Sequence, residues 1–134
     1  MDILNLKKDF SKYKKDLLYL NKYMYKNPEL GYKEIKSVDK IIKLIKTHIE
    51  DAKFKYFNDI PTAFTASINK RSNKKNVAIC IEYNALPNVG HACGHNLISS
   101  IGLGAFFILS KYKKDLDYEI KLVGCPAEEI IPLT

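Results

Sequence analysis

The amino-acid sequence predicts an α/β fold, and three observations support this prediction. Apolar residues recur at steps of three and four through the first 50 positions, which is typical of amphipathic helices. Three short apolar runs follow between residues 54 and 82, each bounded by turn-forming residues. A strand, a helix and a strand then fill residues 77 to 124, so the two strands are expected to be parallel. The predicted order is α-α-β-β-β-α-β.

Two helices are predicted at the start of the chain. The first ends before Asn27-Pro28, and its apolar face consists of Ile3, Leu6, Phe10, Tyr13, Leu17, Leu20 and Met24. Asn27 to Gly31 forms a turn with proline and glycine. The second helix spans roughly Lys33 to Ile49, with an inner face of Ile35, Val38, Ile42, Ile45 and Ile49.

The next three segments, residues 54–57, 63–68 and 77–82, are predicted strands. Asp59-Ile60-Pro61 separates the first two, and a polar turn at residues 71–76 separates the second from the third. The third strand is the most continuously apolar, which is typical of the centre of a sheet. Cys80 lies within it and is expected to be a small buried hydrophobic residue.

The last part of the chain contains an irregular loop at residues 84–96, a helix to about Lys111 and a strand from Tyr118 to Gly124. Gly102 and Gly104 are expected where this helix packs closely on the sheet. Because parallel strands end at the same edge of a sheet, the loop after Glu82 and the turn at residues 126–129 should face each other.

Composition limits the class of protein. At 134 residues, 46% hydrophobic and 28% charged, the chain fits one globular domain. No apolar run reaches the length of a membrane span, and the N-terminus lacks signal-peptide order, so we expect a cytoplasmic protein without membrane contact. The net charge is +7, but every basic residue except Arg71 is a lysine and these are dispersed, so no nucleic-acid partner is expected. The three cysteines have different contexts and do not form a disulfide framework.

The loop at residues 84–96 contains a candidate metal site. His91, Cys93 and His95 alternate, so in an extended segment their side chains would point the same way. A lone histidine is usually a hydrogen-bonded structural residue, but three ligand-type residues within five positions favour a metal. Thiolate and imidazole suit zinc or a similar divalent ion, and one of the three could orient a ligand instead of binding.

Glu128 and Glu129 follow a proline at the end of the last predicted strand. Neighbouring side chains diverge, so one carboxylate can bind a metal while the other accepts a proton from the attacking water. Opposite a metal-binding loop, this pair predicts hydrolysis of an amide or similar bond.

Four segments together resemble the aminoacylase/carboxypeptidase metallopeptidases, peptidase family M-twenty. They are Asn27-Pro-Glu-Leu-Gly31, Glu82-Tyr-Asn-Ala-Leu-Pro87, Gly90-His-Ala-Cys-Gly-His-Asn96 and Gly124-Cys-Pro-Ala-Glu-Glu129. The series is most similar to the branch of aminobenzoyl-glutamate hydrolases and Xaa-Arg or β-alanyl-lysine dipeptidases. The resemblance implies a phosphorylase/hydrolase-like, three-layer α-β-α zinc-exopeptidase catalytic domain, of which residues 1–134 would be an incomplete N-terminal part.

The resemblance also implies roles for individual residues. Cys93, His95 and Glu129 match metal ligands, and Glu128 matches the general base. Glu82, Asn84 and His91 are candidates for supporting positions around the metal. The cofactor would be one or two divalent ions, with zinc expected first and manganese or cobalt as alternatives. The substrate would be a small N-acyl amino acid or dipeptide.

Two departures from the family qualify this expectation. Asn84 stands where the branch usually has aspartate, which would weaken or alter metal binding. Family members are also about three times as long, so the chain is expected to be inactive alone and to associate with a separately encoded C-terminal half. The alternatives are a non-catalytic remnant that binds metal without turnover, and a basic binding module unrelated to catalysis.

Overall fold

The computed structural model describes residues 3–69 and 75–129 of the chain. Its element order is the predicted one, with a short 3-10 turn added before the last strand. The elements are α1 (Ile3–Lys26), α2 (Ile35–His48), β1 (Lys53–Tyr56), β2 (Phe64–Ile68), β3 (Asn76–Glu82), α3 (His95–Lys111), η1 (Lys113–Asp115) and β4 (Glu119–Cys125). The polar turn predicted at residues 71–76 falls largely outside the described residues.

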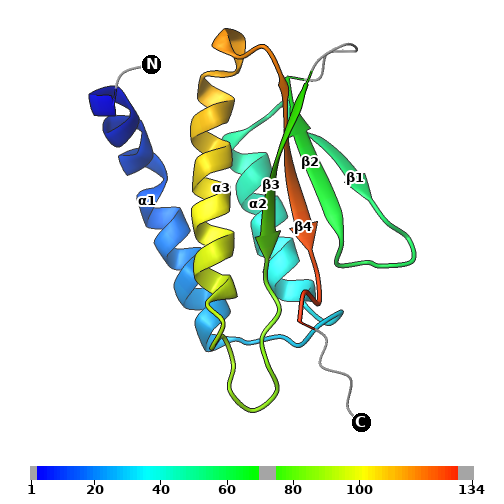
Figure 1. Cartoon of the computed structure of the whole chain (residues 1–134). Helices are drawn as coiled ribbons and strands as arrows, with labels where there is room; N and C mark the ends of the chain where they lie inside the picture. Colours follow the sequence, from blue (N-terminus) through cyan, green and yellow to red (C-terminus); the bar gives the residue numbers. More distant parts are fainter. Residues whose placement is uncertain (1–2, 70–74, 130–134) are drawn as a thin grey trace.

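The four strands form one mixed sheet in the order β1-β2-β4-β3. β1 pairs with β2 and β2 pairs with β4, both antiparallel, whereas β3 and β4 are parallel along their whole length. The predicted parallel β-α-β unit is therefore confirmed. As a result, β3 and β4 end at the same edge of the sheet (Figure 1). At this edge Glu82 is paired in register with Cys125.

The helices pack against one face of the sheet (Figure 1). Alternate residues of β2 and β4 point into this core, and the register places Ala66 opposite Leu122. Helices α1, α2 and α3 supply the other half, through residues such as Leu20, Ile41 and Phe106. The described residues thus contain one helical layer on the sheet, and the second layer of the expected three-layer domain stays a prediction.

Strand β3 differs from its prediction in one respect. Within the described sheet it is an edge strand, and only Ile81 of its residues is fully buried. Cys80 is exposed, so the prediction that it is a buried hydrophobic residue is wrong. The reason is that Ile79 and Ile81 face the helices, whereas Cys80 faces the opposite side of the sheet, which no described helix covers. All three cysteines are free.

The first helix buries a narrower face than predicted, and the buried face of the second helix is shifted relative to the prediction. Of the apolar face of α1, Leu17, Leu20 and Met24 are buried, but Ile3 and Phe10 are exposed. In α2 the buried isoleucines include Ile41, and Ile35 is exposed. No described helix has the length and apolar character required to cross a bilayer.

Candidate metal centre

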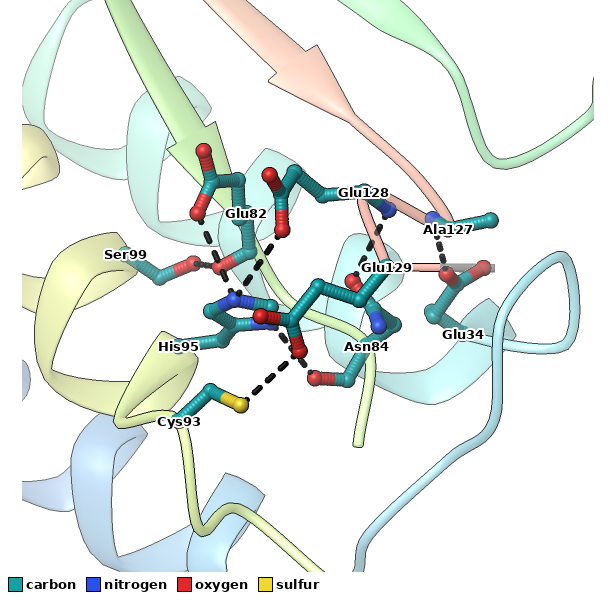
Figure 2. A network of polar contacts seen from close by, with 9 residues as sticks. All are labelled: Glu34, Glu82, Asn84, Cys93, His95, Ser99, Ala127, Glu128 and Glu129. Carbon is teal, nitrogen blue, oxygen red and sulfur yellow. Dashed lines mark hydrogen bonds and ion pairs between the residues drawn. The ribbon is translucent and has the colours of Figure 1, made fainter. Parts of the chain in front are cut away.

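The candidate metal centre lies at the sheet edge where β3 and β4 end (Figure 2). Glu82 is the last residue of β3, His95 is the first residue of α3, and Glu128 lies three residues after β4. One ligand-type atom from each of these residues can be chosen so that all three lie within 4.8 Å of one another. The predicted meeting of the two segments is therefore found in the structure.

The ring of His95 is held in one orientation by the main chain. Its Nδ1 lies 2.9 Å from the carbonyl oxygen of Asn84, which can only accept a hydrogen bond, so Nδ1 carries the proton. In the neutral ring Nε2 is then left with its lone pair available. This atom is 3.4 Å from Glu82 Oε2 and 3.6 Å from Glu128 Oε2. A histidine fixed through one nitrogen and presenting the other is the usual arrangement of a metal ligand.

Cys93 and Glu129 form a second pair beside this cluster (Figure 2). The Cys93 thiol donates a hydrogen bond to Glu129 Oε2 at 2.8 Å. This bond, together with some loss of solvation and the charges of Glu129 and Glu128, raises the pKa of the Cys93 thiol. The two residues predicted as metal ligands with His95 are thus adjacent to each other and on the same side of the sheet edge.

The loop that carries Cys93 is not extended, so the expectation that the side chains of His91, Cys93 and His95 point the same way is wrong. A turn between His91 and Gly94 is closed by a hydrogen bond from Gly94 N to His91 O at 3.1 Å. Gly94 has a φ of 79°, a left-handed conformation that favours glycine, and α3 begins at the next residue. His91 and His95 are consequently both buried while Cys93 is exposed. Burial and the nearby His95 lower the pKa of His91, which favours a neutral ring.

The turn after β4 is fixed by hydrogen bonds to its backbone. Ala127 has a φ of 50°, which is uncommon for a residue other than glycine. The next amide, Glu128 N–H, donates to Asn84 Oδ1 at 3.1 Å. Asn84 is buried and therefore serves both sides of the site, through its carbonyl to His95 and through its side chain to Glu128.

Several supporting residues could not be identified from the sequence. The Ser99 hydroxyl donates to the carbonyl of Glu82 at 2.6 Å, tying α3 to the end of β3. Glu29 accepts hydrogen bonds from Lys36 N and Ser37 N, at 3.0 and 2.8 Å, at the start of α2. Glu29 lies in a motif that the sequence singled out, but the motif gives no indication of which atoms its carboxylate contacts.

The residues present fit a divalent cation. The Glu82 carboxylate and the His95 imidazole could hold the ion, with the Glu128 carboxylate beside them, and the imidazole nitrogen is oriented by a carbonyl on the far side of its ring. Carboxylate and imidazole ligands suit zinc, manganese or cobalt, and the Cys93 thiol beside them would favour zinc once it is deprotonated. Glu82, regarded from the sequence as a supporting residue, lies in the cluster itself.

No protein-family model matches the chain, but individual proteins do. Thermostable carboxypeptidase 2 of Saccharolobus solfataricus is 29% identical over 96% of the chain and 36% of its own length. The Xaa-Arg dipeptidase of Mus musculus is 30% identical over 82% of the chain and 28% of its own length. A solved Bacillus subtilis structure, described as a dinuclear metal-binding peptidase of the M20 family, superposes with a TM-score of 0.79. It is 22% identical and covers 90% of the chain and 37% of the solved chain.

The chain is thus similar in sequence to these peptidases over most of its length, and similar in fold to a peptidase of the M20 family. The resemblance seen in the four sequence motifs is therefore confirmed, and so is the mixed α/β fold that it implied. The chain spans about a third of the length of these relatives. Carboxypeptidase activity, dipeptidase activity and dinuclear metal binding are named for these relatives.

Proposed function

We propose that this chain supplies part of the catalytic site of a metal-dependent amidohydrolase, which hydrolyses an amide or peptide bond in a small N-acyl amino acid or dipeptide. The observation that carries this proposal is the convergence of Glu82, His95 and Glu128 within 4.8 Å at the carboxyl ends of β3 and β4. Relatives named carboxypeptidase and dipeptidase support the choice of an amide bond.

In this proposal the residues divide between holding the ion and moving protons. Cys93, His95 and Glu129 hold a divalent cation, with Glu82 as a further ligand. When bound, such a cation polarises the water or carbonyl that reacts. Glu128 is the general base: its side chain is 43% exposed, so substrate and solvent can reach it, and its Oε2 is 3.6 Å from His95 Nε2. It accepts the proton of the attacking water and returns it to the leaving nitrogen.

Zinc titration of the purified chain tests the ligand set. We expect His95→Ala, Cys93→Ser and Glu129→Gln each to weaken zinc affinity at least about tenfold, because each removes a ligand. Glu128→Gln should change the affinity less than about threefold, since the base does not hold the ion. Isothermal titration calorimetry measures each affinity.

His48→Ala is the matched control for the zinc titration. His48 lies on α2 and its Nε2 is 2.9 Å from Asp16 Oδ2, so it belongs to a different part of the molecule. Zinc affinity in this variant should equal that of the parent. Equal zinc affinity in the parent and in His95→Ala would refute the proposed site.

We also propose that residues 1–134 by themselves bind metal with little or no turnover, because the site needs ligands that these residues do not supply. Of the three histidines in the sequence, His48 is engaged on α2 and His91 is buried, so His95 is the one that presents a ring nitrogen to the cluster. Hydrolysis assays with N-acyl amino acids and dipeptides test whether residues 1–134 have any turnover. Hydrolysis at ordinary enzyme rates by the pure chain would contradict this proposal.

A further inference from the structure

Glu34 is a buried carboxylate whose position is not explained by the helix that it precedes. It occupies the residue before α2, where short polar side chains usually cap the first amides, and its side chain is fully buried. It makes no capping hydrogen bond. That role belongs to Glu29, whose carboxylate accepts from Lys36 N and Ser37 N. Burying a carboxylate costs free energy unless it is hydrogen-bonded, so the hydrogen-bond partner of Glu34 indicates the function of this residue.

The partner of Glu34 is the backbone of the turn that carries the two site carboxylates (Figure 2). Its Oε1 accepts a hydrogen bond from Ala127 N–H at 2.9 Å, across 93 residues of sequence. Among the described residues, the second oxygen, Oε2, has no hydrogen-bond partner, so the Ala127 amide is the polar contact that this carboxylate makes.

Ala127 needs such an anchor because of its conformation. Its φ of 50° lies in the left-handed region, which a residue with a Cβ adopts only when its surroundings hold it there. Gly31 packs against it so closely that a Cβ on Gly31 would lie 2.8 Å from the Ala127 Cβ. Residues 31 to 34 therefore contact the turn both through packing and through the Glu34 carboxylate.

Two consecutive amides of the turn are held by two buried side chains. Glu34 accepts from Ala127 N–H and Asn84 Oδ1 accepts from Glu128 N–H. With these amides fixed, the carboxylate of Glu128 is directed to His95 and that of Glu129 to Cys93. We infer that Glu34 is a positioning residue, which locks the left-handed turn at Ala127 so that Glu128 and Glu129 face the candidate metal centre.

Hydrogen exchange at the Ala127 amide tests this inference without metal or activity. In the metal-free chain, Glu34→Ala should speed exchange of the Ala127 amide by roughly ten- to a hundredfold relative to that of Leu122 in β4, because the hydrogen bond that the Ala127 amide donates is lost. Glu34→Gln keeps an oxygen in place and should restore most of the protection. An unchanged ratio in Glu34→Ala would overturn the inference.

Ile45→Ala is the matched control for this exchange experiment, since Ile45 is a fully buried α2 residue in the core. It should lower global stability and leave the ratio of Ala127 to Leu122 exchange unchanged. If Glu34→Ala does not fold, Glu34→Asp carries the same expectation, because its carboxylate is withdrawn by one methylene group. Normal Ala127 protection in Glu34→Asp would then count against the inference.

Cobalt binding supplies a second arm, which rests on the proposed function. Visible absorption of bound Co²⁺ should show affinity reduced about tenfold or more in Glu34→Ala and nearly restored in Glu34→Gln, as for other residues that orient metal ligands. If the parent chain binds no Co²⁺, the proposed function is refuted. The hydrogen-exchange result then decides the role of Glu34. Unchanged Co²⁺ affinity in Glu34→Ala, with binding in the parent, would overturn the positioning role.

Discussion

At the scale of single residues, Glu29 explains why a short turn motif matters to the whole site. Its carboxylate binds Lys36 N, Ser37 N and the Ser37 hydroxyl, the last at 2.8 Å. These amides belong to the first turn of α2, where backbone donors have no partner within the helix. The carbonyl of Glu29 accepts from Ala85 N at 2.7 Å, so the same residue ties α2 to the loop that follows β3.

Replacing Glu29 by alanine should therefore destabilise the chain by about 1–2 kcal/mol, because three donors at the start of α2 lose their acceptor. Urea unfolding followed by circular dichroism measures the change. Glu50→Ala is the matched control, since Glu50 is an exposed glutamate just after the same helix, and its effect should stay within about 0.5 kcal/mol. Equal losses in the two variants would contradict the capping role.

At the scale of elements, the two glycines of α3 have different functions. The sequence suggested that both allow close packing on the sheet, and this is confirmed for Gly102 alone. A Cβ on Gly102 would lie 2.5 Å from Cγ2 of Ile81, a fully buried residue of β3. Gly104 instead faces α1, where the nearest atoms are the side-chain ends of Leu17 and Phe10 at 3.0 and 3.1 Å.

Alanine substitutions at these glycines should accordingly diverge. Gly102→Ala should destabilise by about 1–3 kcal/mol, since the β-branched side chain of Ile81 cannot yield without moving β3. Gly104→Ala should be within about 1 kcal/mol of the parent, because flexible side-chain ends can shift and alanine favours the helix. Thermal unfolding of both variants side by side checks the difference, and a reversed order would show that α3 packs differently.

At the scale of the whole molecule, Asp9 joins the first helix to the far end of the third. It is 5% exposed, and its carboxylate accepts hydrogen bonds from Lys111 Nζ and from the Tyr112 hydroxyl, the latter at 2.9 Å. These bonds lower the pKa of Asp9 from 3.8 to about 2. The ionised form is thus preferred in the folded chain, so folding is favoured most where Asp9 is charged.

This linkage predicts a pH-dependent effect of Asp9→Asn. Because the folded pKa lies below the unfolded one, the contribution of Asp9 is complete above about pH 4 and is lost as the pH falls towards 2. The variant should be less stable than the parent at pH 7, and the difference should shrink through that window in urea titrations. Asp39→Asn, which removes an exposed ion pair with Lys43, should differ little in stability from the parent across the same pH range.

The sequence predicted the element order well, because the apolar periodicity of each helix and strand reports a local property. It did not predict which faces are covered. Cys80 and Phe10 were expected inside and are exposed, since burial depends on which neighbours the fold supplies. Sheet order is similarly non-local: β4 is last in the chain and lies between β2 and β3.

For the site, the sequence predicted that the segment after Glu82 and the Glu128-Glu129 turn would meet, because parallel strands end at one edge. The metal and catalytic roles of Cys93, His95, Glu128 and Glu129 stay predictions. The contact between Glu34 and Ala127 could not be predicted from the sequence. An acidic residue before a helix is common, and nothing in the sequence around Glu34 indicates a partner 93 residues away.

The hydrogen bond between His95 and the carbonyl of Asn84 has a consequence for how this site tolerates mutation. Every amino acid carries a main-chain carbonyl, so side-chain changes at position 84 leave the acceptor of the His95 proton in place. The same changes do alter the acceptor offered to Glu128 N–H. Substitutions at position 84 can therefore change where the Glu128 carboxylate lies without changing which nitrogen of His95 carries the proton.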